Sequence, residues 1–343
     1  MKRRGLLLTG LSLLIAVLTG CGGGMATPLG AGSAAATSGG VGDSAAETDD
    51  ASAGRVALRI GQIPTVDGLP FWVAEAHGYY EGQGIDVELV NFRSAAERDA
   101  ALQGGQIDGA LADILASVTM YSNGARVHIT SINLGATQEE GPIYILAAPE
   151  SGITSPEQLK GVEIAISTNS MIHYVTEKLL LESGLAPDEI ATISIPQIPV
   201  RFESLMSGTV KAATLPDPLA SLAIARGATV VQSDSQAERN YSQSVIIFTA
   251  RALEEKEEAI RRFFTAYNKA VGDIRQSPDA YRELLAEKAS LPPEIKDSWR
   301  VTAFPDAQLP GRAEVEEVVD WLLEKGVITE KVSYDEIVRA NLY

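Results

Sequence analysis

Cysteine is almost absent from this sequence: among 343 residues the only one is Cys21. One cysteine cannot form a disulfide within the chain, and it cannot supply the paired thiolates of a structural zinc site. Histidine is nearly as scarce. The three histidines, His77, His128 and His173, are far apart, and no H-E-x-x-H motif or EF-hand loop occurs. We therefore expect no metal site.

The sequence motifs of common enzymes are missing as well. No G-x-S-x-G elbow, no Walker A loop and no G-x-G-x-x-G that follows a strand is present. Acidic neighbours such as Glu139–Glu140 are far more often solvated surface than acid–base pairs. These absences predict a protein that is not an enzyme, with no catalytic residue and no cofactor.

Positive charge is also in short supply. The chain has 28 Lys and Arg against 45 Asp and Glu, which gives a formal net charge of −17. A protein that binds nucleic acid needs a basic surface to neutralise phosphates. We therefore exclude nucleic acid as a partner.

Long apolar runs are confined to the N-terminus. Basic residues precede the run Leu6–Leu18, which is too short to span a bilayer comfortably and is typical of a secretory signal. The run ends in Leu18–Cys21 (LTGC), which resembles the cleavage box of bacterial lipoproteins, although a chance thiol after an ordinary signal is the alternative. We expect a signal peptide at 1–20, then an acylated (palmitate-bearing) Cys21 and a flexible linker over 21–54, which is rich in Gly, Ala, Ser and Thr. The protein is then exported and held at the extracytoplasmic face of the cell membrane by lipid.

From Arg55 onward, strand and helix patterns alternate with short turns. Two β-α-β-α-β-like blocks, about 55–145 and 150–231, precede a helical tail. Capping boxes at Ser94–Glu97 and Ser155–Gln158 mark two of the helix starts. Alternation of this kind predicts an α/β fold with parallel sheets covered by helices on both faces.

Polar residues recur where a predicted strand runs into a predicted helix. Parallel sheets bind ligands at the carboxyl ends of their strands, so four such turns, two in each block, predict one cleft between the blocks. The predicted ligand-binding residues at these turns are Thr65, Asp67, Phe71 and Trp72 for the first, Asp113 for the second, Ser167, Thr168, Asn169 and Ser170 for the third, and Asp217 for the fourth.

The third turn lies within Gly161–Tyr174, where a short apolar strand meets the start of a helix. Such a junction leaves backbone N–H groups unpaired, and the helix dipole favours an anion or a carbonyl oxygen there. Ser, Thr and Asn are also the commonest N-caps, so a plain capped helix is the alternative. Phe71 and Trp72 are adjacent on one helix, so at most one of them should face the cleft and the other should be core.

The chain resembles the periplasmic substrate-binding proteins of ABC importers, in the nitrate/sulfonate/taurine branch that also includes binders of thiamine-precursor pyrimidines. The resemblance covers about 55–330, behind the lipoprotein box. The motifs that carry it are Gly68–Ala74 (GLPFWVA) with Gly78–Tyr80 (GYY), Gly105–Ala110 (GQIDGA), Pro156–Ala165 (PEQLKGVEIA) and Leu215–Pro218 (LPDP).

The resemblance implies a type II periplasmic binding protein fold, with two lobes of mixed, mostly parallel sheets joined by two crossover strands. The crossovers are expected near Tyr144–Pro149 and Gln243–Thr249. Lobe one would then comprise 55–145 plus 248–343, and lobe two 146–247. Carried over by position, the resemblance also implies His173 as a ligand-binding residue beside Asn169 and Ser170, with a place in a core as the alternative.

The family also implies the partners, which are a small solute and the permease and ATPase of an importer. It implies a monomeric binding protein. Arg and Lys are missing from the four turns, and Arg201 is the nearest candidate to hold a pure anion. The three aspartates favour a ligand with donors, such as a pyrimidine-like or aromatic molecule, while a taurine-like sulfonate zwitterion stays open. Two other functions also remain, a thiamine-precursor enzyme on the same fold and a solute-sensing lipoprotein or adhesin.

Overall fold

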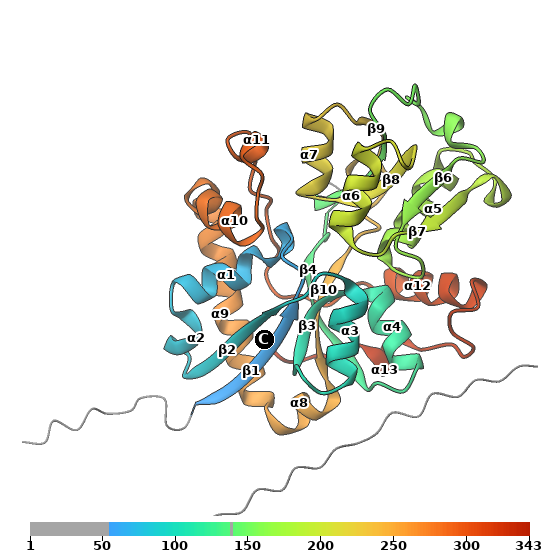
Figure 1. Cartoon of the computed structure of the whole chain (residues 1–343). Helices are drawn as coiled ribbons and strands as arrows, with labels where there is room; N and C mark the ends of the chain where they lie inside the picture. The colour runs from blue at the N-terminus through green and yellow to red at the C-terminus, as the bar shows by residue number, and fades with distance from the viewer. Residues whose placement is uncertain (1–54, 138–139) are drawn as a thin grey trace, which may run out of the picture. The chain divides into compact units, whose positions relative to one another are not determined.

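The computed structural model of the chain describes residues 55–137 and 140–343 (Figure 1). The predicted signal peptide, Cys21 and the linker up to residue 54 lie outside the described residues. None of the helices in the described part has the length and apolar character needed to cross a membrane.

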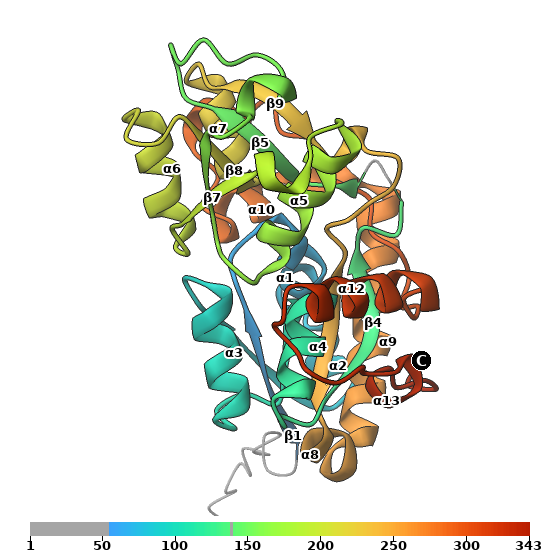
Figure 2. The same cartoon turned by 90° about the vertical axis from the view of Figure 1, so that its right-hand side faces the viewer.

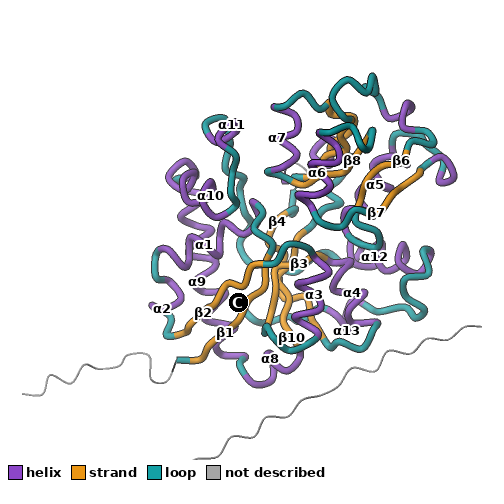
Figure 3. The backbone as a smooth tube through the Cα atoms, in the orientation of Figure 1, coloured by secondary structure: helices purple, strands orange, loops and turns teal. Residues whose placement is uncertain are grey.

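The strands of the described residues form two five-stranded sheets, which the tube trace of Figure 3 shows as two groups. The first sheet has the order β2-β1-β3-β10-β4 and the second β7-β6-β8-β5-β9. The strands are β1 (Val56–Gln62), β2 (Ile85–Asn91), β3 (Gly109–Asp113), β4 (Val127–Leu134), β5 (Ile143–Ala147), β6 (Glu163–Ile166), β7 (Ala191–Ser194), β8 (Ala212–Pro216), β9 (Thr229–Ser233) and β10 (Ser244–Thr249).

Helices fill the connections and form the C-terminal part of the chain. The α-helices are α1 (Leu69–Ala76), α2 (Tyr79–Gly82), α3 (Ala95–Gln103), α4 (Ile114–Ser122), α5 (Met171–Glu182), α6 (Ile198–Met206), α7 (Leu219–Ala225), α8 (Ala250–Glu255), α9 (Glu257–Gln276), α10 (Arg282–Lys288), α11 (Pro293–Lys296), α12 (Arg312–Glu324) and α13 (Tyr334–Ile337). Short 3-10 helices are η1 (Val66–Gly68), η3 (Pro156–Leu159), η4 (Pro187–Glu189), η5 (Asp234–Gln236) and η6 (Pro278–Tyr281).

The two sheets share one plan, and we call each sheet with its flanking helices a lobe. Strands β1, β2 and β3 of lobe one correspond to β6, β7 and β8 of lobe two in order and in parallel pairing. In each sheet one antiparallel strand is inserted, β10 between β3 and β4, and β5 between β8 and β9. The predicted α/β fold with two lobes and mixed sheets is confirmed.

The chain changes sheet earlier than the predicted crossovers. Strand β5 pairs only within the second sheet and β10 only within the first. The chain therefore leaves the first sheet in 135–142 and returns to it in 234–243. The expected crossovers Tyr144–Pro149 and Gln243–Thr249 coincide with these two strands, because an apolar strand pattern does not reveal which sheet the strand joins.

Side-chain alternation along the strands divides the core between two faces of each sheet. In lobe one, Leu58, Ile60 and Phe248 are fully buried towards α1 and α9. The neighbouring positions Val245 and Ile247 are buried on the opposite face, towards α4. Figures 1 and 2 show these helices on the two sides of the sheet. Because both faces are covered, β3 is buried along its whole length and β10 along all but its last residue, while β1 is buried at its carboxyl end.

Helix α9 is the main support of one face. Apolar residues recur along it at helical spacing, and these are buried: Ile260, Phe263, Phe264, Tyr267, Val271 and Ile274. Four aromatic rings, Phe71, Phe248, Phe263 and Phe264, make edge-to-face contacts within this layer. Such contacts stabilise the layer beyond the burial of apolar area alone.

Candidate functional site

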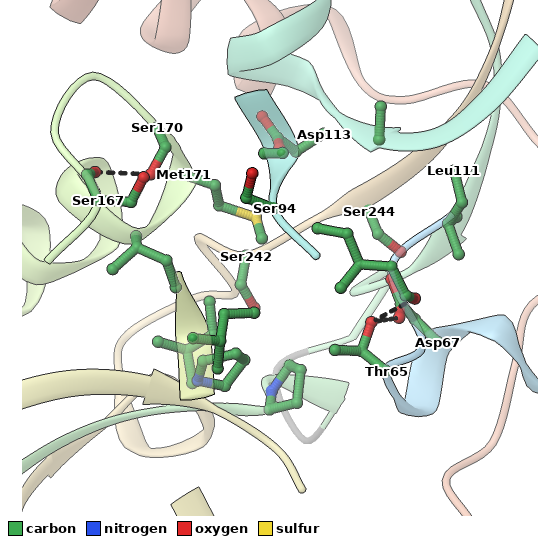
Figure 4. A pocket seen from close by; sticks show the side chains of 18 of the residues that line it. Thr65, Asp67, Ser94, Leu111, Asp113, Ser167, Ser170, Met171, Ser242 and Ser244 are labelled. Atoms are coloured by element: carbon green, nitrogen blue, oxygen red, sulfur yellow. Dashed lines mark hydrogen bonds between the residues drawn. The ribbon is translucent and has the colours of Figure 1, made fainter. Parts of the chain in front are cut away.

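A cavity of about 110 Å³ lies where the carboxyl ends of β1, β3, β6 and β8 come together (Figure 4). Both lobes contribute to its wall. The lining residues are Ile63, Thr65, Val66, Asp67, Ser94, Ala95, Arg98, Leu111, Ala112, Asp113, Leu134, Pro142, Ile143, Ser167, Ser170, Met171, Ile172, Pro196, Ile198, Arg201, Pro216, Asp217, Ser242 and Ser244. The predicted cleft between the two blocks is therefore present.

On the side of lobe one, Asp67 is held by the turn that follows β1. Its carboxylate accepts a hydrogen bond of 2.6 Å from the Thr65 hydroxyl, and its backbone carbonyl accepts one of 2.9 Å from the Asn133 side chain. Burial raises the pKa of Asp67, while the hydrogen bond from Thr65 opposes that rise. The carboxyl group is thus fixed in position at the cavity.

Asp113 ends β3 and is the N-cap of α4. Its Oδ1 accepts a hydrogen bond of 2.7 Å from the backbone N–H of Ala116, which satisfies one of the free donors of the first turn. Burial raises the pKa of Asp113 to about 6, although the nearby Arg98 guanidinium lowers it. The carboxyl group of Asp113 is thus held at the start of α4, where it lines the cavity.

On the side of lobe two, Asp217 follows β8 in the equivalent place. Its Oδ1 accepts a hydrogen bond of 2.9 Å from the backbone N–H of Ser221 in α7. Burial raises the pKa of Asp217 to about 6. The two lobes therefore present matching carboxyl groups, each attached to the start of a helix.

The turn between β6 and α5 contributes Ser167, Ser170 and Met171. The Ser170 hydroxyl donates a 2.7 Å hydrogen bond to the Ser167 carbonyl, which closes the turn. The Ser170 side chain accepts no hydrogen bond from the helix start, so it shapes the wall rather than capping α5.

Six of the predicted residues line the cavity: Thr65, Asp67, Asp113, Ser167, Ser170 and Asp217. Thr168 and Asn169 do not, since both are exposed on the outer side of the turn. Asn169 has a left-handed backbone, φ 55°, which Asn tolerates better than most residues. That conformation gives Asn169 a structural reason to occupy the turn.

Phe71 and Trp72 also do not line the cavity. Both are buried, at 0% and 2% exposure, because α1 packs against α9, α10 and α2. The Phe71 ring lies 5.5 Å from Phe263 and 6.1 Å from Tyr267, centroid to centroid. Both aromatic residues therefore belong to the core, whereas the sequence allowed one of them to face the cleft.

His173 faces helix α12. Its ring lies edge-to-face on Trp321 at 5.2 Å, and its Nε2 is 4.0 Å from Glu177. Burial lowers the pKa of His173. Helix α12 lies beside α4 (Figure 2) and also reaches α5 through Lys325–Glu177 and Lys178–Glu317, at 2.6 and 2.9 Å. His173 thus belongs to a contact between the lobes outside the cavity.

Several lining residues had no sequence signal for a site. Ser242 and Ser244 lie where the chain returns to the first sheet, and a crossover has no periodic pattern. Ser94 was recognised only as a helix cap, and Arg98 only as a residue of that helix. Arg201 alone had been considered as a ligand contact, and it too lines the cavity.

A wider groove of about 770 Å³ adjoins the cavity. The two share Ile63, Thr65, Ile198, Pro216 and Asp217 in their walls. The rest of the groove is largely apolar, with Phe92, Phe202, Leu219 and Leu222 among its lining residues. No group of three or more His, Cys, Asp or Glu side chains in the described part of the chain is arranged to hold a metal ion.

Solved structures share this fold. One is the alkanesulfonate-binding protein SsuA from Xanthomonas axonopodis pv. citri bound to MOPS, 20% identical, with a TM-score of 0.70 over 83% of this chain and 98% of that chain. The periplasmic aliphatic sulphonate binding protein SsuA from Escherichia coli has 22% identity and a TM-score of 0.68, over 84% of this chain and 99% of that one. The periplasmic nitrate-binding protein NrtA from Synechocystis PCC 6803 has 14% identity and a TM-score of 0.66, over 82% and 84%.

Among curated proteins, the chain is similar to one from Escherichia coli (strain K12) named "Putative aliphatic sulfonates-binding protein". The two are 25% identical over 290 residues, which is 82% of this chain and 88% of that protein. The NMT1/THI5 like family matches residues 66–281, a range that includes all of lobe two, most of lobe one, three of the four turns at the cavity in full and the first turn from Val66 onward. The chain therefore belongs to the NMT1/THI5-like family.

Proposed function

We propose that this chain is the extracytoplasmic substrate-binding lipoprotein of an ABC importer, which captures a small solute in the cavity and delivers it to a permease. The observation that carries the proposal is that both lobes supply the wall of one cavity. A solute held on both sides stabilises the closed arrangement, so that docking to a permease depends on occupancy. The relatives with names that state binding of sulfonates or nitrate support transport rather than catalysis.

The chemistry of the wall favours a compact polar solute. The cavity has a volume of about 110 Å³. None of its described lining residues is aromatic, so a planar ring would find no stacking partner there. Of the solutes considered, pyrimidine-like, aromatic or sulfonate- and taurine-like, the last suits the cavity best.

The carboxyl groups of Asp67, Asp113 and Asp217 need donors on the solute. An ammonium group satisfies them, because it carries both the opposite charge and several N–H bonds. A solute with an amine is therefore favoured over a plain anion such as nitrate.

Binding is tested by a melting-shift screen of the mature chain with taurine, alkanesulfonates, aminopyrimidines and amino acids, followed by calorimetry. We expect one compact amine-bearing solute to raise the melting temperature and to bind with one-to-one stoichiometry. The variant Asp217→Asn should weaken the binding of that solute. The variant Asn169→Leu, at an exposed residue of the turn between β6 and α5, should not weaken it. If no solute shifts the melting temperature, the proposal fails.

Membrane attachment through Cys21 is the second part of the proposal. Acylation at Cys21 would hold the protein beside its permease, and the linker over 21–54 would let it move. A sensor has the same anchor and cavity, and a thiamine-precursor enzyme has the same fold. Uptake of the solute by vesicles that contain the partner permease, dependent on this protein and on ATP, distinguishes transport from both.

A further inference from the structure

Arg98 and Arg201 occupy the same place in the two lobes. Each is the fourth residue of the helix that follows the second strand of its block, α3 for Arg98 and α6 for Arg201. Each donates to the carbonyl of the third residue of the next strand: Arg98 Nη1 to Leu111 at 2.9 Å and Arg201 Nε to Thr214 at 2.8 Å. Both are buried, at 4% and 0% exposure, and both line the cavity.

Only Arg98 has a counter-ion within its own lobe. Its Nε and Nη2 lie 2.8 and 2.7 Å from the Asp99 carboxylate, the next residue in the sequence. Its charge also lowers the pKa of Asp67 and of Asp113, so it lies close to both carboxyl groups. In lobe one, the charge of Arg98 is therefore balanced by Asp99, and the carboxyl groups of Asp67 and Asp113 add further negative charge.

Arg201 is not balanced in this way. The residue after it is Phe202, and its remaining hydrogen bonds go to the carbonyls of Ile195 at 2.6 Å and Pro196 at 3.2 Å. Its Nη2 has no hydrogen-bond partner among the described residues, and none of their carboxylates forms an ion pair with it. Burial lowers the pKa of Arg201 to about 10, so the side chain is still protonated at neutral pH.

A buried cation without a counter-ion is strongly unfavourable unless something supplies the opposite charge. Arg201 has no exposed surface through which bulk solvent could supply it. Arg201 lines the cavity, so a negative group bound there would lie beside its guanidinium. The planar guanidinium fork is well suited to a sulfonate or carboxylate oxygen.

We propose that Arg201 binds the anionic group of the solute. This anionic group is then the counter-ion of Arg201 in lobe two, as Asp99 is the counter-ion of Arg98 in lobe one. This inference rests on the proposed function and narrows it. The solute is then a small zwitterion, an amino-sulfonate or amino acid, with its anion against Arg201 and its ammonium against Asp67 and Asp113. The opposite charges of the two ends hold the lobes together when the solute is bound.

The inference is tested by calorimetry with taurine, which has both groups, ethanesulfonate, which has the anion alone, and ethanolamine, which has the cation alone. Loss of one charged hydrogen bond weakens binding by about 10- to 100-fold. We expect Arg201→Gln to weaken the binding of taurine and of ethanesulfonate by that factor and to leave the binding of ethanolamine unchanged. Arg275→Gln, which removes an exposed arginine paired with Asp306, is the matched control and should change none of them.

A second variant leaves Arg201 in place, in case Arg201→Gln does not fold. Ile198 lines the cavity one helical turn before Arg201, so Ile198→Glu puts a carboxylate beside the guanidinium. We expect this variant to lose ethanesulfonate binding, because the anion site is already filled, and to unfold at a higher temperature than the wild type.

Three results overturn the inference. In the first, Arg201→Gln is folded and binds taurine as tightly as the wild type. In the second, the wild type binds ethanolamine or an aminopyrimidine but binds neither taurine nor ethanesulfonate. That result leaves the proposed function intact. In the third, none of these probes binds, which counts against both.

Discussion

The buried carboxyl of Asp113 makes the stability of the empty protein depend on pH, and Asp113→Asn tests this. Burial raises the pKa of Asp113 from 3.8 to about 6. The folded chain therefore keeps a proton that the unfolded chain releases near pH 3.8. As the pH rises from about 4 through about 6, the unfolded state binds fewer protons than the folded state, so stability falls.

The magnitude follows from the size of that shift. A difference of about 2 pH units at about 1.4 kcal/mol each corresponds to about 3 kcal/mol, an upper value for the stability that is lost when Asp113 ionises in the folded protein. Asparagine keeps an oxygen that can accept the N–H of Ala116, and Asn is as good an N-cap as Asp. Asp113→Asn should therefore remove the pH effect without loss of the cap.

Guanidinium denaturation at pH 5 and pH 8 measures the effect in the absence of ligand. The wild type should lose stability between the two, and Asp113→Asn should lose less by about 1–1.5 kcal/mol, because at pH 5 the unfolded chain has already released its proton and only the pH range from 5 to about 6 contributes. Asp306→Asn, at an exposed carboxylate, is the control and should behave like the wild type. Asp217→Asn should add to the effect, since burial raises the pKa of Asp217 to about 6 as well. An Asp113→Asn protein with the same pH dependence as the wild type would refute the reasoning.

Three further predictions concern other parts of the chain. Gly109→Ala should destabilise the fold by about 1–3 kcal/mol in thermal or chemical unfolding, because its new Cβ would lie 2.6 Å from the backbone oxygen of Ile247. Its control is Gly272→Ala in α9, where a Cβ meets no neighbour, and this variant should stabilise the fold by up to about 1 kcal/mol. Trp321→Ala should cost about 3–5 kcal/mol in the same assay and leave one-to-one binding intact, since Trp321 is buried against α5 and does not line the cavity. Cys21→Ala should release the protein from membranes into the soluble fraction, and continued sedimentation with membranes would contradict acylation there.

Much of the fold could be predicted because the strands alternate and the turns are marked. The apolar pattern of Val127–Leu134 predicts a strand, and this segment is β4 with the same bounds. The pattern that predicts α6 begins at Arg201, whereas the helix begins at Ile198, because Pro199 is tolerated in the first turn, where its missing N–H is not needed. Helices α2, α11 and α13 span four residues each, too few for a periodic pattern to appear.

The candidate site could be predicted only in part, for a physical reason. The ends of strands are visible in the sequence, and the turns that contain Asp67, Asp113 and Asp217 do line one cavity. Whether a side chain points into that cavity or into a core is decided by the layers above it. Phe71 follows the first turn but is enclosed by α9, while Arg201 lies mid-helix and reaches the cavity because its helix crosses the end of β8. Neither fact is present in the local pattern.

The insertion of β10 between β3 and β4 has a consequence for the order in which the protein is completed. Every strand of lobe two lies between residues 143 and 233, so that lobe can form as soon as this stretch of chain is available. Lobe one lacks the strand that joins β3 to β4 until residues 244–249 arrive, and it lacks its α9 layer until residue 276. During synthesis, lobe one, which begins first, is therefore finished last. Until then, the apolar edges of β3 and β4 are exposed, and this interval is when the chain is most prone to aggregate.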